Sequence, residues 1–180
     1  MPDPRRLTGL VVVVPEAEPV VGSLRHRLDG NAALGVPAHV TVLFPFVPVG
    51  RLDDAVLRRV RAVVGAVPRF GYDFAGTDWF DDDVLWLAPT DPAPFRRLTE
   101  LVAAEFPQHP PFEGRFDEVV PHLTVGHGHP RAALEAAARS VASRLPVKGT
   151  ATEVTLLAQV EPGGRWATVA AFPLGEFSPR

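Results

Sequence analysis

Cysteine is absent from this 180-residue chain, lysine occurs only at Lys148, and the longest aliphatic run near the start extends only from Leu10 to Val14. Without cysteine the chain has no disulfide framework, thiolate zinc site, iron–sulfur cluster or cysteine nucleophile. The aliphatic run is too short to span a bilayer, since a membrane helix needs about 20 apolar residues. We therefore expect a soluble, cytoplasmic protein that does not interact with membranes.

The charge and the apolar content indicate a folded domain with no general affinity for nucleic acid. Its 18 basic residues are balanced by 21 acidic ones, the net charge is −3, and 46% of the residues are hydrophobic. A protein that coats nucleic acid carries an excess of positive charge, so this balance argues against one and still permits a small anionic substrate. The length and the apolar fraction suit a single domain over residues 1–180.

Hydrophobic spacing predicts a fold that repeats itself. Strands are expected at 10–14, 39–44, 70–77, 84–88, 119–125, 147–160 and 166–174, and helices at 19–28, 52–64, 92–106 and 130–145. Turns are expected at 78–83 and at Gly163-Gly164 in the last hairpin. The order is βαβαβ and then βαβαββ. We therefore expect a bilobal, pseudo-twofold α+β fold, with two mostly antiparallel sheets, helices on their outer faces and a cleft between them.

The strongest functional signal is a pair of matching strands. One reads His39-Val40-Thr41-Val42 and the other reads His122-Leu123-Thr124-Val125, at equivalent places in the two halves. Successive side chains of a strand point to opposite faces, so each histidine shares a face with the threonine two residues later. If the two lobes face each other, two imidazoles and two hydroxyls line one cleft. A single His-x-Thr is common by chance, and its duplication within a repeat makes it informative.

These side chains suit chemistry at a phosphodiester without a metal or other cofactor. Histidine has an unperturbed pKa of about 6.5, so a pair can act as base and acid near neutral pH. One histidine takes a proton from water, the other protonates the leaving oxygen, and the threonine hydroxyls bond non-bridging oxygens. We expect no metal site at His127, because a strand residue five positions after His122 points to the opposite face.

The paired motifs resemble the signature of the 2H phosphoesterase superfamily, which contains 2'-5' RNA ligases and cyclic phosphodiesterases. The flanking residues are similar as well, with Pro37-Ala38 and Leu43-Phe44-Pro45-Phe46 around the first motif and Pro121 before the second. The resemblance covers nearly the whole chain.

The resemblance implies hydrolysis of a 2',3'-cyclic phosphate, on a nucleotide or an RNA end, to a 2'-phosphomonoester. It implies that His39 and His122 are the catalytic pair and that Thr41 and Thr124 hold the phosphate. In this superfamily the first-motif histidine is usually the acid and the second the base.

Two further residues are candidates for binding the substrate. Arg115 lies in the loop that enters the second motif strand, where a guanidinium is placed to reach a phosphate. Phe44 is our aromatic candidate for stacking on a base. The wider group of such candidates is Phe44, Phe46, Trp79, Phe80 and Phe112.

Two alternatives stay open. Joining of RNA ends by a 2'-5' bond is the reverse-type activity of some members, but long RNA requires a basic track along the cleft, and the net charge speaks mildly against one. A non-catalytic nucleotide- or RNA-binding module would keep the cleft without turning over a substrate. Nothing in the sequence implies a stable protein partner.

Overall fold

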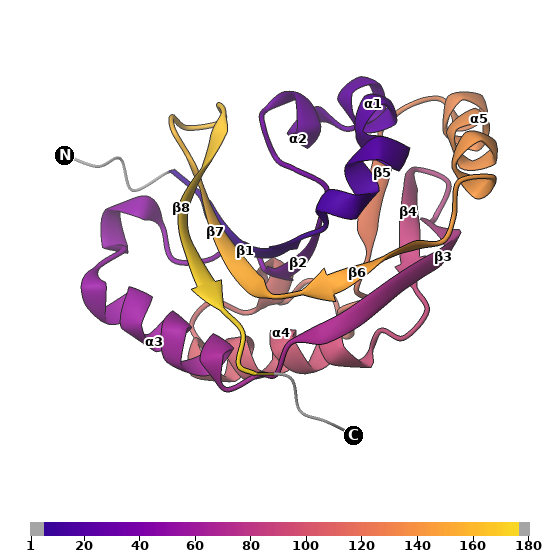
Figure 1. The fold of residues 1–180 in the computed structure, drawn as a ribbon. Coiled ribbons are helices and arrows are strands. Elements are labelled where there is room, and N and C mark those ends of the chain that lie inside the picture. The colour runs from indigo at the N-terminus through magenta and orange to yellow at the C-terminus, as the bar shows by residue number, and fades with distance from the viewer. Residues whose placement is uncertain (1–5, 177–180) are drawn as a thin grey trace.

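The computed structural model describes residues 6–176, and it contains two antiparallel sheets of four strands each (Figure 1). The strands are β1 (Thr8–Val13), β2 (His39–Leu43), β3 (Phe70–Phe80), β4 (Val84–Pro89), β5 (Leu123–His127), β6 (Val147–Ala151), β7 (Glu153–Gln159) and β8 (Trp166–Pro173). The helices are α1 (Glu18–Leu28), α2 (Gly30–Ala33), α3 (Asp54–Gly65), α4 (Ala93–Glu105) and α5 (Arg131–Ala142). The strand order is β2-β1-β7-β8 in the first sheet and β5-β4-β3-β6 in the second. The expected α+β class is confirmed.

Helices from each half of the chain pack on the sheet of the other half. The first-half helix α1 packs against β5, and the second-half helix α4 packs against β2. The helix α3 contacts β8, and α5 contacts β3, β4 and β5 (Figure 1). One buried cluster contains Val40 and Val42 of the first sheet together with Leu123 and Val125 of the second. The two lobes therefore share a core and hold their motif strands against each other.

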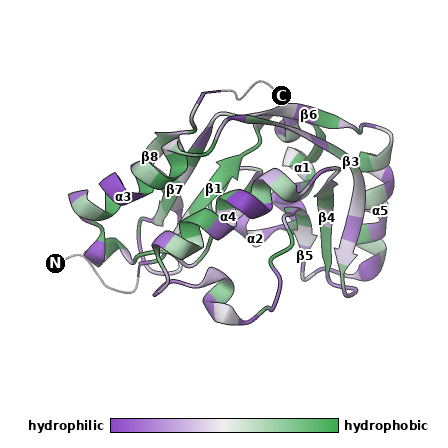
Figure 2. Cartoon of the chain, turned by 90° about the horizontal axis from the view of Figure 1, so that it is seen from below, coloured by the Kyte–Doolittle hydropathy of each residue, from purple (hydrophilic) through white to green (hydrophobic). Residues whose placement is uncertain are grey.

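The elements follow from local patterns. Figure 2 shows the inner strands β1 and β4 as mainly hydrophobic, whereas α3 and α4 also present hydrophilic residues. Asp53 caps α3, because its carboxylate accepts a hydrogen bond from the Val56 amide at 2.8 Å. Asp91 accepts from the Ala93 amide at 3.0 Å where α4 begins. No helix in the described part of the chain has the length and apolarity to cross a membrane.

Several element boundaries differ from expectation, and the strand expected at 119–125 begins only at Leu123 and continues to His127. Residues 147–160 form two strands instead of one, since β6 pairs with β3 and β7 pairs with β1. This segment thus crosses from the second sheet to the first. The sequence could not predict the crossing, because an apolar pattern indicates that a strand is buried but does not show which sheet it joins. The expected turn at 78–83 is shorter, because β3 continues to Phe80, which pairs with Val84. Asp81 in the remaining turn has a φ of 49°.

Candidate active site

The two His-x-Thr motifs meet because each lies at a sheet edge. The strand β2 is an edge of the first sheet, β5 is an edge of the second, and these two strands contact each other. Thr41 and Thr124 are partly exposed, whereas the motif residues between and after the polar positions are buried. The predicted alternation is therefore present, and the fold brings together segments that lie 83 residues apart.

Both histidine rings are held in the same way. The Nδ1 atom of His39 lies 2.7 Å from the carbonyl oxygen of Pro37, and Nδ1 of His122 lies 2.7 Å from that of Val120. A carbonyl oxygen only accepts hydrogen bonds, so each Nδ1 carries a hydrogen and donates it. The neutral rings therefore keep a lone pair on Nε2, which has no hydrogen-bond partner among the described residues. Each imidazole is fixed in orientation with one nitrogen free for proton transfer.

The repeat extends to an irregularity in each motif strand. The register between β1 and β2 shifts at Val42, and the register between β4 and β5 shifts at Val125, in both cases directly after the motif threonine. An extra residue in a strand reverses the alternation of faces beyond it. For this reason His127 lines the same pocket as His122 and Thr124. The expectation that His127 points to the opposite face was wrong, because it assumed a regular strand.

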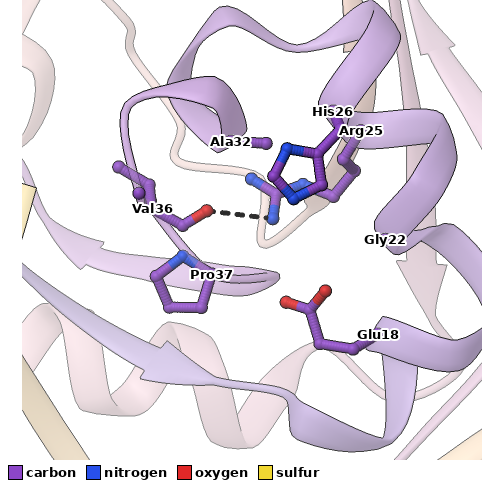
Figure 3. A pocket seen from close by; sticks show the side chains of 8 residues that line it. Glu18, Gly22, Arg25, His26, Ala32, Val36 and Pro37 are labelled. Atoms are coloured by element: carbon purple, nitrogen blue, oxygen red, sulfur yellow. Dashed lines mark hydrogen bonds between the residues drawn. The ribbon is translucent and has the colours of Figure 1, made fainter. Parts of the chain in front are cut away.

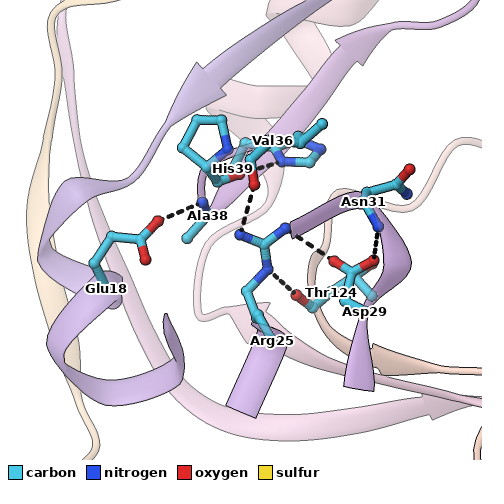
Figure 4. A network of polar contacts seen from close by, with 9 residues as sticks. Glu18, Arg25, Asp29, Asn31, Val36, Ala38, His39 and Thr124 are labelled. Carbon is cyan, nitrogen blue, oxygen red and sulfur yellow. Dashed lines mark hydrogen bonds and ion pairs between the residues drawn. The ribbon is translucent and has the colours of Figure 1, made fainter. Parts of the chain in front are cut away.

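A buried arginine lies between the second motif and the segment that precedes the first motif (Figure 4). Arg25, in the last turn of α1, is 2% exposed and pairs with the carboxylate of Asp29 at 2.9 Å. Its Nη1 donates to the Val36 carbonyl at 3.2 Å, and its Nε donates to the Thr124 carbonyl at 3.1 Å. The sequence does not single out this residue, because it is one arginine among many on amphipathic helices. The only available signal is the Arg–Asp spacing of four residues at a helix end.

A small pocket of about 150 Å³ adjoins the same arginine. Figure 3 shows that Arg25 and His26 from α1 lie across this pocket from Pro37, with Glu18 at the other end of the helix. Glu18 also accepts a hydrogen bond from the Ala38 amide at 2.7 Å. The helix α1 therefore contacts the segment before His39 from both of its ends.

Burial keeps both motif imidazoles neutral. It lowers the pKa of His39 from 6.5 to about 4, and the hydrogen bond to the backbone opposes this shift. The positive charge of Arg25 lowers the same pKa further, the carboxylate of Asp29 raises it, and His122 lowers it slightly. Burial also lowers the pKa of His122, again against the backbone hydrogen bond. Without a ligand, both rings are therefore proton acceptors at neutral pH.

A pocket of about 720 Å³ opens beside the second motif and is lined by His122 and Thr124. Its volume is in the range typical of small-molecule sites, roughly 300–1,000 Å³. The first-motif residues His39 and Thr41 are not among its lining residues. The guanidinium of Arg131 lies 3.7 Å from the ring centroid of Trp79 and fixes one wall. The aromatic lining residues are Trp79, Phe80, Phe112 and Phe116.

The charged lining of this larger pocket is mainly acidic. Four carboxylates line it, and no arginine or lysine does so among the described residues. Three of the four lie 2.9–3.0 Å from a basic side chain. The four are Asp29, Asp81, Asp83 and Glu118. Within residues 6–176, no group of three or more histidine and carboxylate side chains is arranged to hold a metal ion.

The two remaining candidates, Arg115 and Phe44, lie outside this pocket. Arg115 is 73% exposed and its guanidinium pairs with Glu113 at 2.6 Å. Phe44 packs against Trp166, with ring centroids 6.1 Å apart. The carbonyl of Phe44 accepts a hydrogen bond from the Phe112 amide at 2.6 Å, so this residue anchors the loop that carries a pocket aromatic.

The other aromatic candidates are divided between pocket and core. Trp79, Phe80 and Phe112 line the pocket, whereas Phe46 is buried against Phe106. Phe116, which is not among these candidates, lines the pocket and is 63% exposed. Its place in the proline-rich loop before the second motif was the signal that the sequence offered for it.

The fold and the site define a two-sheet α+β protein in which paired His-x-Thr strands meet beside a pocket of substrate size. A family model described as the 2'-5' RNA ligase superfamily matches residues 13–162, and the chain belongs to this superfamily. The resemblance read from the paired motifs is thereby confirmed. The superfamily comprises 2H phosphoesterases and RNA ligases and is enzymatic in general.

Solved structures share the fold at low sequence identity. The Escherichia coli protein LigT, crystallised with 3'-AMP, is 16% identical with a TM-score of 0.62, and the match covers 94% of this chain and 98% of LigT. LigT complexed with NADP+ has a TM-score of 0.58 at 16% identity, covering 97% of this chain and 100% of LigT. TT0787 of Thermus thermophilus has a TM-score of 0.56 at 17% identity, covering 94% of this chain and 98% of TT0787. No curated protein matches the sequence.

Proposed function

We propose that this protein hydrolyses a 2',3'-cyclic phosphate to a 2'-phosphomonoester without a metal, using His39 and His122 to transfer protons. The observation that carries the proposal is the matched fixing of the two imidazoles. Each ring donates Nδ1–H to the carbonyl two residues earlier, at 2.7 Å, and keeps Nε2 for the substrate. Two histidines with only a structural role would not need to be held by the same hydrogen bond in both motifs.

The reaction balances with the groups present. The oxygen of a water molecule attacks phosphorus while one imidazole Nε2 takes its proton. The bond between phosphorus and the 3'-oxygen breaks, and the other imidazole, entering as imidazolium, protonates that oxygen. The product carries a 2'-phosphate and a free 3'-hydroxyl. The hydroxyls of Thr41 and Thr124 donate to non-bridging oxygens, where charge grows in the transition state.

We assign the base to His39 and the acid to His122. Burial lowers the pKa of both rings, and the positive charge of Arg25 lowers the pKa of His39 further, a cause that does not act on His122, so we take His39 as the ring that stays unprotonated. His122 lines the larger pocket, where the negative charge of a bound phosphate raises its pKa and lets it carry a proton. This assignment reverses the roles that the family resemblance implies, and it is open to direct test.

The pocket favours a small substrate over a long RNA strand. No arginine or lysine is among its described lining residues, so the pocket offers no cationic track for a polyanion. A cyclic phosphate carries one negative charge, which the threonine hydroxyls and one imidazolium can match. The aromatic walls suit a nucleobase. The titles of the LigT structures name complexes with 3'-AMP, ATP and NADP+, which supports a nucleotide-sized substrate here.

The decisive experiment is a turnover assay with the nucleoside 2',3'-cyclic phosphates and with a short RNA that ends in a cyclic phosphate. We expect a 2'-phosphate product and a higher kcat/KM for the mononucleotides. His39→Ala and His122→Ala should each lower kcat about 10²–10⁴-fold, the usual contribution of a general acid or base. Thr41→Ala and Thr124→Ala should lower kcat/KM about 10- to 100-fold, as for hydrogen bonds to a charged group.

The matched control is His26→Ala, which removes an exposed histidine from α1. This variant should keep the wild-type rate. If His39→Ala or His122→Ala hydrolyses the cyclic phosphate as fast as the wild type, the mechanism is excluded. A folded wild type that binds a nucleoside 2'-phosphate but turns over no cyclic phosphate would indicate the binding module instead.

A further inference from the structure

We propose that the buried Arg25–Asp29 pair is a positioning device that fixes the two catalytic motifs relative to each other. The inference rests on the proposed function, because it concerns the spacing of the two histidine-bearing segments. One guanidinium bonds the carbonyl of Val36, three residues before His39, and the carbonyl of Thr124 in the second motif. Figure 4 shows the guanidinium between these two segments.

The second motif can accept this bond because of its place in the sheet. The strand β5 is an edge strand, so carbonyls on its outer side have no neighbouring strand to bond. Arg25 satisfies that of Thr124 at 3.1 Å. The guanidinium is planar and its donors have fixed angles, so bonding both segments at once sets the distance between them. Lysine has a point-like ammonium and lacks this geometry.

The first motif is held at several successive backbone groups. Arg25 bonds the carbonyl of Val36, Glu18 accepts from the amide of Ala38 at 2.7 Å, and His39 itself bonds the carbonyl between them. Both of the side chains from outside this segment come from α1. Because α1 also packs against β5, a single helix joins the two motifs.

A stabilising role alone explains this pair poorly. Arg25 is 2% exposed and Asp29 is 5% exposed, so both charges have lost most of their hydration. Replacement of a buried ion pair by apolar residues of similar size is often neutral or stabilising. The pair is also asymmetric in its effect, since Arg25 lowers the pKa of His39 and Asp29 raises it. The pair thus acts on the position and on the charge state of the first-motif histidine.

The experiment compares Arg25→Lys, Arg25→Met and Asp29→Asn with the wild type. The charged groups that act on His39 are Arg25 of α1, Asp29 at the start of α2 and His122 before β5. Titration of the His39 ring by NMR should show a raised pKa in Arg25→Met and a lowered pKa in Asp29→Asn. In the cyclic phosphate assay, Arg25→Lys and Arg25→Met should each lower kcat at least tenfold with a smaller change in KM, because misplacement by about 1 Å can cost about 100-fold.

The matched control is Arg59→Met. Arg59 also pairs with a carboxylate and bonds a backbone carbonyl, both in Glu105, but it is 44% exposed and joins α3 to α4 away from the pocket lining. It should change neither kcat nor the His39 titration. If Arg25→Met unfolds, Arg25→Lys still tests the geometry, because it keeps a positive charge beside Asp29. Folded Arg25→Ala can also be supplied with guanidinium ions, because the 150 Å³ pocket adjoins the vacated space. Recovery of at least part of kcat by guanidinium, and not by ammonium, would support the proposal.

Two results would overturn the inference: a kcat within twofold of wild type in folded Arg25→Met and Arg25→Lys, or His39 pKa shifts of the same sign in Arg25→Met and Asp29→Asn. The NMR titration needs no turnover. If the wild type hydrolyses no cyclic phosphate, the proposed function fails, and the backbone amide NMR shifts of both motif segments in Arg25→Met, compared with Arg59→Met, still decide whether Arg25 positions the two motifs.

Discussion

Acidification should destabilise this protein through His39, and the size of the effect follows from its surroundings. Burial lowers the pKa of the folded-state ring from 6.5 to about 4. One pKa unit corresponds to about 1.4 kcal/mol, so this lowering of the pKa corresponds to about 3 kcal/mol. The His39 ring is partly exposed, and water that reaches it weakens the effect of burial, so about 3 kcal/mol is an upper bound.

The direction follows from proton binding in the two states. Between pH 6.5 and about 4 the unfolded chain protonates His39 and the folded chain does not. The contribution of this residue to stability is therefore fully present above pH 6.5, and it is lost as the pH falls through the folded-state pKa. His39→Gln removes the titrating group while the other histidines remain in both proteins and cancel in the comparison.

The assay is urea unfolding of the wild type and of His39→Gln across this pH range. The free energy of unfolding of the wild type, relative to the variant, should fall by up to about 3 kcal/mol as the pH drops from above 6.5 to near 4. His26→Gln, at an exposed position of α1, is the control for the substitution itself. A difference between wild type and His39→Gln that is independent of pH would refute the argument that His39 is kept neutral, and with it the assignment of the base.

Three further predictions concern the mechanism and the packing near the site. A p-nitrophenyl phosphodiester has a leaving group that needs no acid, so His122→Ala should recover activity on it and His39→Ala should not; the opposite pattern would exchange the two roles. Hydrolysis of the cyclic phosphate should be unchanged by EDTA, and strong inhibition would restore a metal mechanism. A Cβ at Gly126 would lie 2.7 Å from Cδ2 of Leu134, so Gly126→Ala should lower the free energy of unfolding by about 1–3 kcal/mol. Gly30→Ala is its matched control, because a Cβ there meets nothing within 4 Å, and it should not destabilise; equal unfolding midpoints for the two variants would contradict the packing argument.

The paired motifs could be found without a structure because their signal is local. A strand has a period of two, so His39 and Thr41 share a face whatever the rest of the chain does. The duplication at His122 and Thr124 then supplied the repeat and the family resemblance. The same local rule failed at His127, because an extra residue at Val125 reverses the faces. Such a register shift depends on the partner strand, which the motif does not contain.

The surroundings of candidates outside the motifs could not be read from the sequence for a related reason. Phe44 and Arg115 lie close in sequence to the motif strands, yet one packs on Trp166 and the other pairs with Glu113. Phe116 lies in a loop without a repeating pattern, and only its folded position brings it to the pocket. Proximity in sequence is a weak guide where a loop determines the direction of a side chain.

The order of strands and helices, the buried faces and the two His-x-Thr strands are all written in the chain, because periodicity and turn residues act over a few positions. The meeting of β2 with β5 and the exchange of helices between halves depend on which apolar surfaces find each other. Periodicity marks a surface as buried without naming its partner. The burial of Arg25 also depends on the tertiary structure. Its side chain is buried and bonds both motif segments only because α1, from the first half, packs on β5 of the second half.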